Sequence, residues 1–338
     1  MKKLLWIALV ITIIFFSSAC KKTSVTYVGN WSQRSDFDGR SRSGSTSFVI
    51  GNFGYLCFGT DGKNYLSDLW QYNSDKDYWT QEAACPGTGR IYATGFGVGS
   101  DGIIGSGQDI NINYLGDFWR YSSTNNTWAK TDSMAVNNGR SGALSFALNG
   151  LGYMGTGFNG DYLKDFYAFD PNGGTNGKWT VLPGYPGHKR SHGLAFIIDN
   201  KAYILTGIDN GTLVTDMWRF DPTDQSWAGK TATDLRDIST TTNVGYKIIR
   251  TNGVAFSSGG KGYVALGNLS SSILNDVWEY TPGTDEWHQK VSFEGSSRTD
   301  AVSFSINDRI FVTTGRNGSY QLSDTWEFAP NAAYDPNN

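Results

Sequence analysis

The sequence predicts an all-β chain made of six repeats that close into a ring. Its composition is the first reason: 42 glycines, 14% aromatic residues and only 8 prolines in 338 residues are typical of short strands joined by tight turns, because glycine supplies the positive φ that turns need. The second reason is a repeat of about fifty residues, which places all but Trp6 of the 12 tryptophans in two columns. One column holds Trp70, Trp119, Trp218, Trp278 and Trp326, with Tyr167 in the third repeat, and the other holds Trp31, Trp79, Trp128, Trp179, Trp227 and Trp287. A continuous repeat indicates one domain.

Further columns fall into register with the tryptophans and predict four strands per repeat. Each repeat opens with an arginine: Arg42, Arg90, Arg140, Arg190, Arg250 and Arg298. A second strand then runs into a glycine at Gly59, Gly107, Gly157, Gly207, Gly267 and Gly315. An aspartate follows at Asp68, Asp117, Asp165, Asp216, Asp276 and Asp324. Two residues beyond it lies the first tryptophan column, and two further an aromatic residue, at Tyr72, Tyr121, Phe169, Phe220, Tyr280 and Phe328. A period of two is typical of one buried face of a strand.

This arrangement resembles the kelch repeat, whose four-stranded units form the blades of β-propellers. The resemblance covers Tyr27 to Phe328. The glycine doublet usual in kelch motifs appears here as Thr-Gly, Ser-Gly or Leu-Gly in five repeats and as Phe-Gly in the first, so the array is a divergent one. The resemblance implies a six-bladed propeller similar to the central domain of galactose oxidase.

The two ends of the array predict how the ring closes. The last repeat stops at Phe328 after its third strand, whereas residues 27–33, with Trp31, form a fourth strand with no first three before it. We expect this N-terminal strand to be the outer strand of the last blade, which removes the exposed sheet edges of a linear array. The expected domains are a signal peptide (1–19), a lipidated cysteine and tether (20–26), the propeller (27–329) and a polar tail (330–338).

The N-terminus has the layout of a bacterial export signal. Lys2 and Lys3 precede an apolar run, and Ser17-Ser18-Ala19-Cys20 resembles a lipoprotein cleavage box. We expect Cys20 to be lipidated and the protein to be anchored in the envelope, at the outer membrane, facing the periplasm or the cell surface. The alternative is simple secretion, with Cys20 near an ordinary cleavage site. Cys57 and Cys85 then remain; free thiols are favoured, and their pairing stays open.

The charge balance indicates which partners to expect. The formal net charge is -3 and the chain has no basic cluster, which argues against nucleic acid. We expect a monomer without a cofactor or a metal site, whose partner is an envelope protein or a glycan and whose membrane contact is the lipid anchor alone.

The repeated arginines and aspartates flank connections on one face of the ring, and two roles are open for them. They can form ion pairs that fix the loops, or the arginines can hold an anionic ligand, as arginines at this position do on the ligand-binding faces of kelch relatives. We favour the first role for most of them, because a fold needs a residue six times and a site needs it once. All six arginines remain candidate ligand-binding residues.

Binding residues should appear where the repeat breaks its symmetry. The position two after each arginine is glycine at 44 and 142, but Tyr92, His192, Asn252 and Asp300 elsewhere. With Arg190 and His188 these residues form the candidate polar cluster at the channel mouth; the alternative is that they are solvated loop ends. A second break is the long connection at 228–249, which predicts a loop over the same face.

These residues are compatible with two functions. The first is a binding module that presents one propeller face to a protein or glycan, without catalysis. The alternative, implied by the kelch resemblance, is a sugar mutarotase or epimerase of the sialic-acid type, in which Arg190, His192, Asp300 and Glu294 would supply an anion clamp and proton relays. A copper radical oxidase is disfavoured, because the three histidines include His288 on an outer strand, and no cysteine is placed beside a ligand tyrosine.

Overall fold

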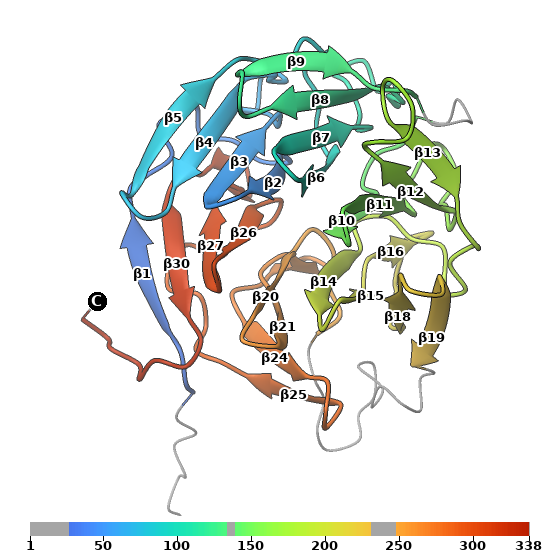
Figure 1. Cartoon of the computed structure of the whole chain (residues 1–338). Helices are drawn as coiled ribbons and strands as arrows, with labels where there is room; N and C mark the ends of the chain where they lie inside the picture. The colour runs from blue at the N-terminus through green and yellow to red at the C-terminus, as the bar shows by residue number, and fades with distance from the viewer. Residues whose placement is uncertain (1–26, 134–138, 231–247, 338) are drawn as a thin grey trace, which may run out of the picture.

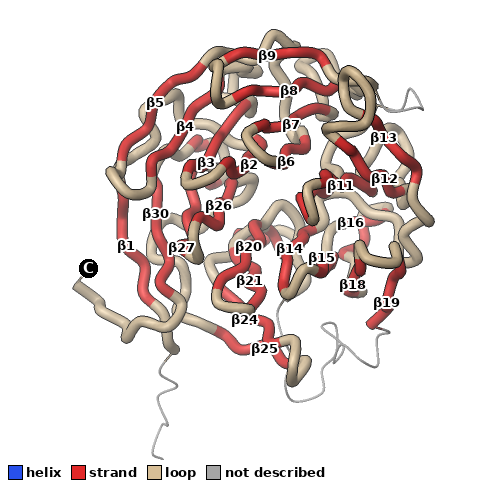
Figure 2. Tube along the Cα trace, viewed as in Figure 1, coloured by secondary structure: helices blue, strands red, loops and turns tan. Residues whose placement is uncertain are grey.

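The computed structural model describes residues 27–133, 139–230 and 248–337. In these ranges it contains strands, turns and loops but no helix, and hence no helix that could span a membrane. Six four-stranded antiparallel sheets are arranged radially as the blades of a propeller, each with its first strand nearest the axis (Figure 1). Figure 2 shows the same path, with the strands in red joined by loops and turns in tan. The predicted six-bladed all-β propeller is therefore confirmed.

Each blade contributes one inner strand, two middle strands and one outer strand, in chain order for blades 1 to 5. Blade 1 holds β2 (Thr46–Ile50), β3 (Phe53–Cys57), β4 (Leu69–Asn73) and β5 (Tyr78–Glu82); blade 2 holds β6 (Thr94–Val98), β7 (Asp101–Gly105), β8 (Phe118–Ser122) and β9 (Thr127–Lys130); blade 3 holds β10 (Leu144–Leu148), β11 (Leu151–Gly155), β12 (Phe166–Asp170) and β13 (Lys178–Val181). Blade 4 holds β14 (Leu194–Ile198), β15 (Lys201–Leu205), β18 (Met217–Asp221) and β19 (Ser226–Lys230); blade 5 holds β20 (Val254–Ser258), β21 (Lys261–Ala265), β24 (Val277–Thr281) and β25 (Glu286–Gln289).

Blade 6 closes the ring with strands from both ends of the chain. It comprises β26 (Val302–Ile306), β27 (Arg309–Thr313), β30 (Thr325–Ala329) and the N-terminal β1 (Asn30–Arg34). In β1, Trp31 lies opposite Phe328 of β30, and the two rings stack at 4.6 Å between centroids. The N-terminal strand therefore completes the last blade, as predicted.

Small hairpins extend the connections between the second and third strands of blades 4 to 6. They are β16 (Ile208–Asp209) with β17 (Thr212–Leu213), β22 (Asn268–Leu269) with β23 (Ser272–Ile273), and β28 (Arg316–Asn317) with β29 (Tyr320–Gln321). In blades 1 to 3 the equivalent connections carry isolated bridges instead. We call these six connections the crown; they lie on the face where each repeat opens with its arginine.

The outer tryptophans pack neighbouring blades together. Trp179 of β13 lies 4.8 Å between ring centroids from Phe118 of blade 2, and Trp227 of β19 lies 5.0 Å from Phe166 of blade 3. A buried aromatic side chain removes about 150–250 Å² from water, or about 4–6 kcal/mol at 25 cal/mol per Å² as an upper bound. The same blade interface recurs around the ring, which is why the tryptophan column recurs in the sequence.

The residue before each strand-two glycine explains the divergent glycine doublet. It has a positive φ in every blade, at Phe58, Ser106, Thr156, Thr206, Leu266 and Thr314, with φ from 56° to 66°. The first glycine of a doublet adopts this conformation without a steric cost. In this chain residues with side chains adopt the positive φ at that position, and all six blades still have four strands.

Several predicted features lie outside the described residues or remain untested. The signal, Cys20 and the tether fall within residues 1–26, and most of the insertion at 228–249 falls within 231–247, so neither is described. Cys57 and Cys85 are both buried as free thiols.

Candidate functional site

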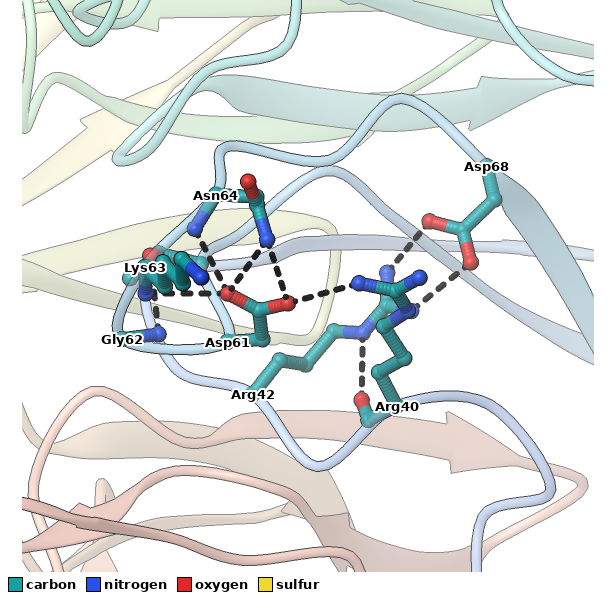
Figure 3. A network of polar contacts seen from close by, with 8 residues as sticks. Arg40, Arg42, Asp61, Gly62, Lys63, Asn64 and Asp68 are labelled. Carbon is teal, nitrogen blue, oxygen red and sulfur yellow. Dashed lines mark hydrogen bonds and ion pairs between the residues drawn. The ribbon is translucent and has the colours of Figure 1, made fainter.

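The six repeated arginines are sealed in the scaffold. Each has no exposed side-chain surface. In blade 1, Arg42 donates to both carboxylate oxygens of Asp68 at 2.6 and 2.7 Å and to the Arg40 carbonyl at 2.9 Å (Figure 3). It also donates to the Phe58 carbonyl at 3.0 Å. The guanidinium also lies over the ring of Phe37. Its donors are thus committed to the protein.

The same ion pair occurs in every blade. The pairs are Arg42–Asp68, Arg90–Asp117, Arg140–Asp165, Arg190–Asp216, Arg250–Asp276 and Arg298–Asp324. Each arginine also donates to the carbonyl of the left-handed residue before the strand-two glycine. Its own carbonyl accepts the N–H of that glycine in the preceding blade, with Gly315 donating to Arg42 across the closure. This geometry favours the scaffold role for the arginines, including Arg190.

These contacts lower the pKa of four of the repeated aspartates, Asp68, Asp117, Asp165 and Asp324. Burial alone would raise the pKa of the Asp68 carboxyl, but the hydrogen bonds and charge of Arg42 outweigh burial and lower it. The indole N–H of Trp70 adds a hydrogen bond to the same carboxylate at 2.7 Å. In blade 3 the hydroxyl of Tyr167 makes the equivalent bond to Asp165 at 2.8 Å. Tyrosine therefore replaces tryptophan in the first column without loss of this contact.

The symmetry-breaking positions converge at the mouth of the central channel. Gly44, Tyr92, Gly142, His192, Asn252 and Asp300 all have φ between 53° and 67°. Their backbones are joined around the axis by five hydrogen bonds of 2.7–3.0 Å: Gly44 to Asp300, Tyr92 to Gly44, Gly142 to Tyr92, His192 to Gly142, and Asp300 to Asn252. The fold thus uses the backbone of these residues, which leaves their side chains free to differ.

The four side chains bridge the mouth from blade to blade. The rings of Tyr92 and His192 meet edge to face at 4.6 Å between centroids, across Gly142 of the blade between them. A Cβ on Gly142 would lie 2.7 Å from the His192 ring, so glycine is required for this crossing. Tyr92 and Asp300 line the same cavity. Asn252 donates its amide N–H to one carboxylate oxygen of Asp300 at 2.5 Å.

The electrostatics of the mouth fix which groups are neutral. Burial lowers the pKa of His192, with Asp300 opposing part of that shift, so the imidazole is neutral at pH 7. Its Nδ1 lies 3.1 Å from the Ser191 hydroxyl, whereas Nε2 is buried without a partner in the described structure. Burial and then the Asp300 charge raise the pKa of Tyr92, so its hydroxyl keeps its proton. The mouth therefore combines a neutral base, a proton donor and a carboxylate.

These residues line a cavity of about 160 Å³. It shares Ser45, Gly193 and Ala301 with a second cavity, of about 210 Å³, further along the axis. That one shares Ser47, Ser145 and Ser303 with a third, of about 450 Å³. The mouth is thus the smallest of three connected cavities along the inner strands, which are lined by small side chains near the mouth and by phenylalanines, among them Phe48, Phe96 and Phe146, farther along the axis.

Not every candidate residue reaches this cavity. Tyr92, His192, Asn252 and Asp300 line it. The His188 side chain is exposed, and its backbone N–H caps Asp216. Glu294 does not line the mouth cavity. Burial and then the charge of Asp335, near the C-terminus, raise the pKa of its carboxyl.

Sequence reasoning missed Arg316, which lies on β28 and donates through Nε to Asp300 at 2.7 Å. The residue directly after each strand-two glycine forms a column of its own: Thr60, Gln108, Phe158, Ile208, Asn268 and Arg316. Arg316 is its only cation. Aligning that column would have revealed it.

The comparisons with known proteins agree with the fold. No family model matches the chain. Over 80 residues the chain is 29% identical to the N-acetylneuraminate epimerases of two Haemophilus influenzae strains, PittEE and 86-028NP, a match that covers 22% of this chain. The chain thus spans only 20% of the length of these curated relatives. The solved structure of YjhT is similar with a TM-score of 0.68 at 16% identity, covering 86% of this chain and 96% of that one.

Proposed function

We propose that the channel mouth of this propeller binds a reducing sugar and interconverts its anomers by acid–base chemistry. The observation that carries this proposal is the convergence of Tyr92, His192, Asn252 and Asp300 on one cavity. The packing of a blade does not require a side chain at this position, because glycine occupies it in blades 1 and 3.

The size of the cavity restricts the ligand. Ordinary small-molecule sites occupy about 300–1,000 Å³, whereas the mouth cavity measures about 160 Å³. It therefore fits a single sugar ring, or one end of a longer ligand, rather than an enclosed oligosaccharide. Its polar groups, an amide, a phenol, an imidazole and a carboxylate, match sugar hydroxyls.

The mouth has the groups that ring opening needs. A base takes the proton of the anomeric hydroxyl, a carbonyl forms at the anomeric carbon, its bond to the ring oxygen breaks, and an acid gives a proton to that oxygen. When the Nδ1–H of His192 donates to Ser191, Nε2 carries the lone pair of a base. The Tyr92 hydroxyl is the acid. Closure on the opposite face of the carbonyl reverses both transfers and gives the other anomer.

The similarity to N-acetylneuraminate epimerase supports acidic sugars as the first ligands to test. It is confined to 80 residues, so the activity of those relatives is a proposal for this chain.

The second candidate function is a binding module that displays the mouth to an envelope glycan or protein. The observation that favours it is that the Asp300 carboxylate is already engaged by Asn252 and Arg316, which suits recognition of a hydroxyl without turnover. Export and lipidation at Cys20, supported by the sequence at 17–20, belong to this proposal.

Anomer exchange followed by NMR tests the proposal. Pure anomers of N-acetylneuraminate and of a neutral hexose are mixed with the protein, with His192→Gln, and with His288→Gln as the matched control, because His288 is exposed on an outer strand. We expect catalysed exchange that falls about 100-fold or more in His192→Gln and is unchanged in the control. Saturable binding without exchange would select the binding module. If the protein shows neither binding nor exchange, both sugar proposals are overturned.

A further inference from the structure

The crown places two further circles of residues around the channel mouth. The residue after each strand-two glycine pairs with the residue directly before a mouth position, as Phe158 does with Ser141, the neighbour of Gly142. This inner circle consists of Thr60, Gln108, Phe158, Ile208, Asn268 and Arg316. Each member pairs in turn with a residue of the outer circle, which consists of Tyr65, Tyr114, Tyr162, Leu213, Ile273 and Gln321. All members of both circles are partly exposed, so a ligand that extends from the mouth on this face passes over them.

Aromatic side chains in the two circles gather on blades 2 and 3. The rings of Tyr114 and Phe158 lie edge to face at 5.8 Å between centroids, and those of Phe158 and Tyr162 lie at 4.9 Å. Blade 6, which lies opposite blade 3 in the ring of six (Figure 1), holds Arg316 and Gln321 at the same positions. A blade therefore forms without aromatic residues there. We call Tyr114, Phe158 and Tyr162 the aromatic platform.

The platform offers polar groups as well as apolar ring faces. Within the part of the chain that the structure describes, the hydroxyls of Tyr114 and Tyr162 make no hydrogen bond. A partly exposed tyrosine suits a partner that is apolar on one side and polar on the other. A pyranose ring has this character, because its C–H bonds form an apolar face and its hydroxyls surround the edge. The platform thus matches the chemistry of a sugar ring.

We propose that the aromatic platform binds the second sugar residue of a glycan whose reducing end occupies the mouth, so that the ligand of this propeller is an oligosaccharide. This inference rests on the part of the proposed function that puts a sugar in the mouth. It adds a second subsite and a class of ligand to that proposal.

The size of the mouth is the first argument for a second subsite. Its cavity of about 160 Å³ is smaller than ordinary small-molecule sites, which occupy about 300–1,000 Å³. Once one sugar ring fills it, any further residue of the ligand lies outside the cavity, over the crown. The crown therefore contributes to binding only if the ligand is longer than one residue.

The position of the platform is the second argument. Tyr92 of blade 2 and His192 of blade 4 meet over Gly142 of blade 3. Phe158 belongs to the same blade and pairs with the residue before Gly142. The proposed acid and base and the platform thus lie on the same side of the axis. A sugar held against Tyr92 and His192 has its next residue within reach of Phe158.

Calorimetric titration of the purified protein tests the inference. The probes are N-acetylneuraminate and its linear trimer, and glucose and its β-1,4-linked trimer. In the series that binds, we expect the trimer to bind about fivefold or more tightly than the monomer. Tyr162→Ala should lower this ratio of affinities to about one, whereas Tyr162→Phe, which keeps the ring, should preserve it. Tyr320→Ala is the matched control, because Tyr320 is 77% exposed in the crown of blade 6, and it should leave the ratio unchanged.

The outcomes separate this inference from the proposed function. A trimer that binds no more tightly than its monomer, or a ratio unaffected by Tyr162→Ala, would overturn the platform, while anomer exchange of the monomer would still support catalysis at the mouth. Trimer binding that depends on Tyr162, without exchange, would confirm the platform and overturn catalysis. If no monomer or trimer binds, the sugar in the mouth and the platform are both overturned, and an apolar protein segment becomes the occupant to test.

Discussion

Replacing a repeated arginine should destabilise the propeller without removing the chemistry of its mouth. Arg90 is the clearest case. It donates to both oxygens of Asp117 at 2.7 and 2.9 Å, to the carbonyls of Ser106 and Thr88, and lies over the ring of Phe58. Arg90→Met keeps much of the apolar volume but leaves these acceptors without their donor.

The magnitude follows from burial. Arg90 is fully buried, while the Asp117 side chain is 25% exposed. Breaking a buried ion pair by removing one partner costs about 3–5 kcal/mol, and partial solvation of Asp117 puts this case toward the lower end of that range. By comparison, the exposed pair of Arg40 and Asp61, with Arg40 67% exposed, should contribute less than about 1 kcal/mol.

Urea unfolding at pH 7 measures both effects. We expect Arg90→Met to lose about 3 kcal/mol, and the double variant Arg90→Met with Asp117→Leu to recover part of that loss, because no buried charge then lacks a partner. Arg40→Met should unfold like the unaltered protein. Below the unfolding transition, Arg90→Met should retain the sugar binding or exchange of the parent. A loss below about 1 kcal/mol accompanied by loss of ligand binding would refute the scaffold interpretation.

Three further outcomes follow from the same geometry. Tyr167→Phe removes one hydrogen bond to Asp165 and should cost about 0.5–1.5 kcal/mol in urea unfolding, whereas Tyr167→Trp should retain the contact and the stability. Gly142→Ala places a methyl group against the His192 ring and should abolish exchange or sugar binding at the mouth, whereas Gly150→Ala, with a similar positive φ but open space around it, should cost stability alone. Thermal stability should fall as the pH drops below about 4, the unfolded pKa of aspartate. The lowered pKa of Asp68, Asp117, Asp165 and Asp324 gives stability that is present above that pH and is lost as the folded carboxyls are protonated. A melting temperature constant down to pH 2 would contradict this.

The sequence was informative wherever one contact recurs in every blade. The arginine, aspartate and tryptophan columns mark a single buried arrangement, and its repetition predicted both the strands and the ring closure at Trp31. Tyr92 and His192 were predicted from the opposite signal, because they stand at a position whose residue type differs from repeat to repeat. Sequence could not show that Asp216 engages Arg190, or that Arg316 reaches Asp300. Both depend on which loops the strand register brings together, as in the bridge from Thr299 to Arg316.

The backbone conformation at the mouth explains why function could arise there. The six positions that the five backbone hydrogen bonds of the mouth join all have a left-handed backbone, and glycine adopts it at Gly44 and Gly142 with little strain. Asparagine, aspartate and histidine tolerate this conformation better than most residues with side chains, whereas for a tyrosine it costs about 1–2 kcal/mol. The chain nevertheless keeps Tyr92 and His192 there, in contact with each other over Gly142. The same conformation recurs at scaffold positions such as Phe58 and Leu266, so positive φ by itself marks no site. Tyr92 and His192 differ from these residues because their side chains line the mouth cavity, which is the reason to look for the ligand of this propeller at these two residues.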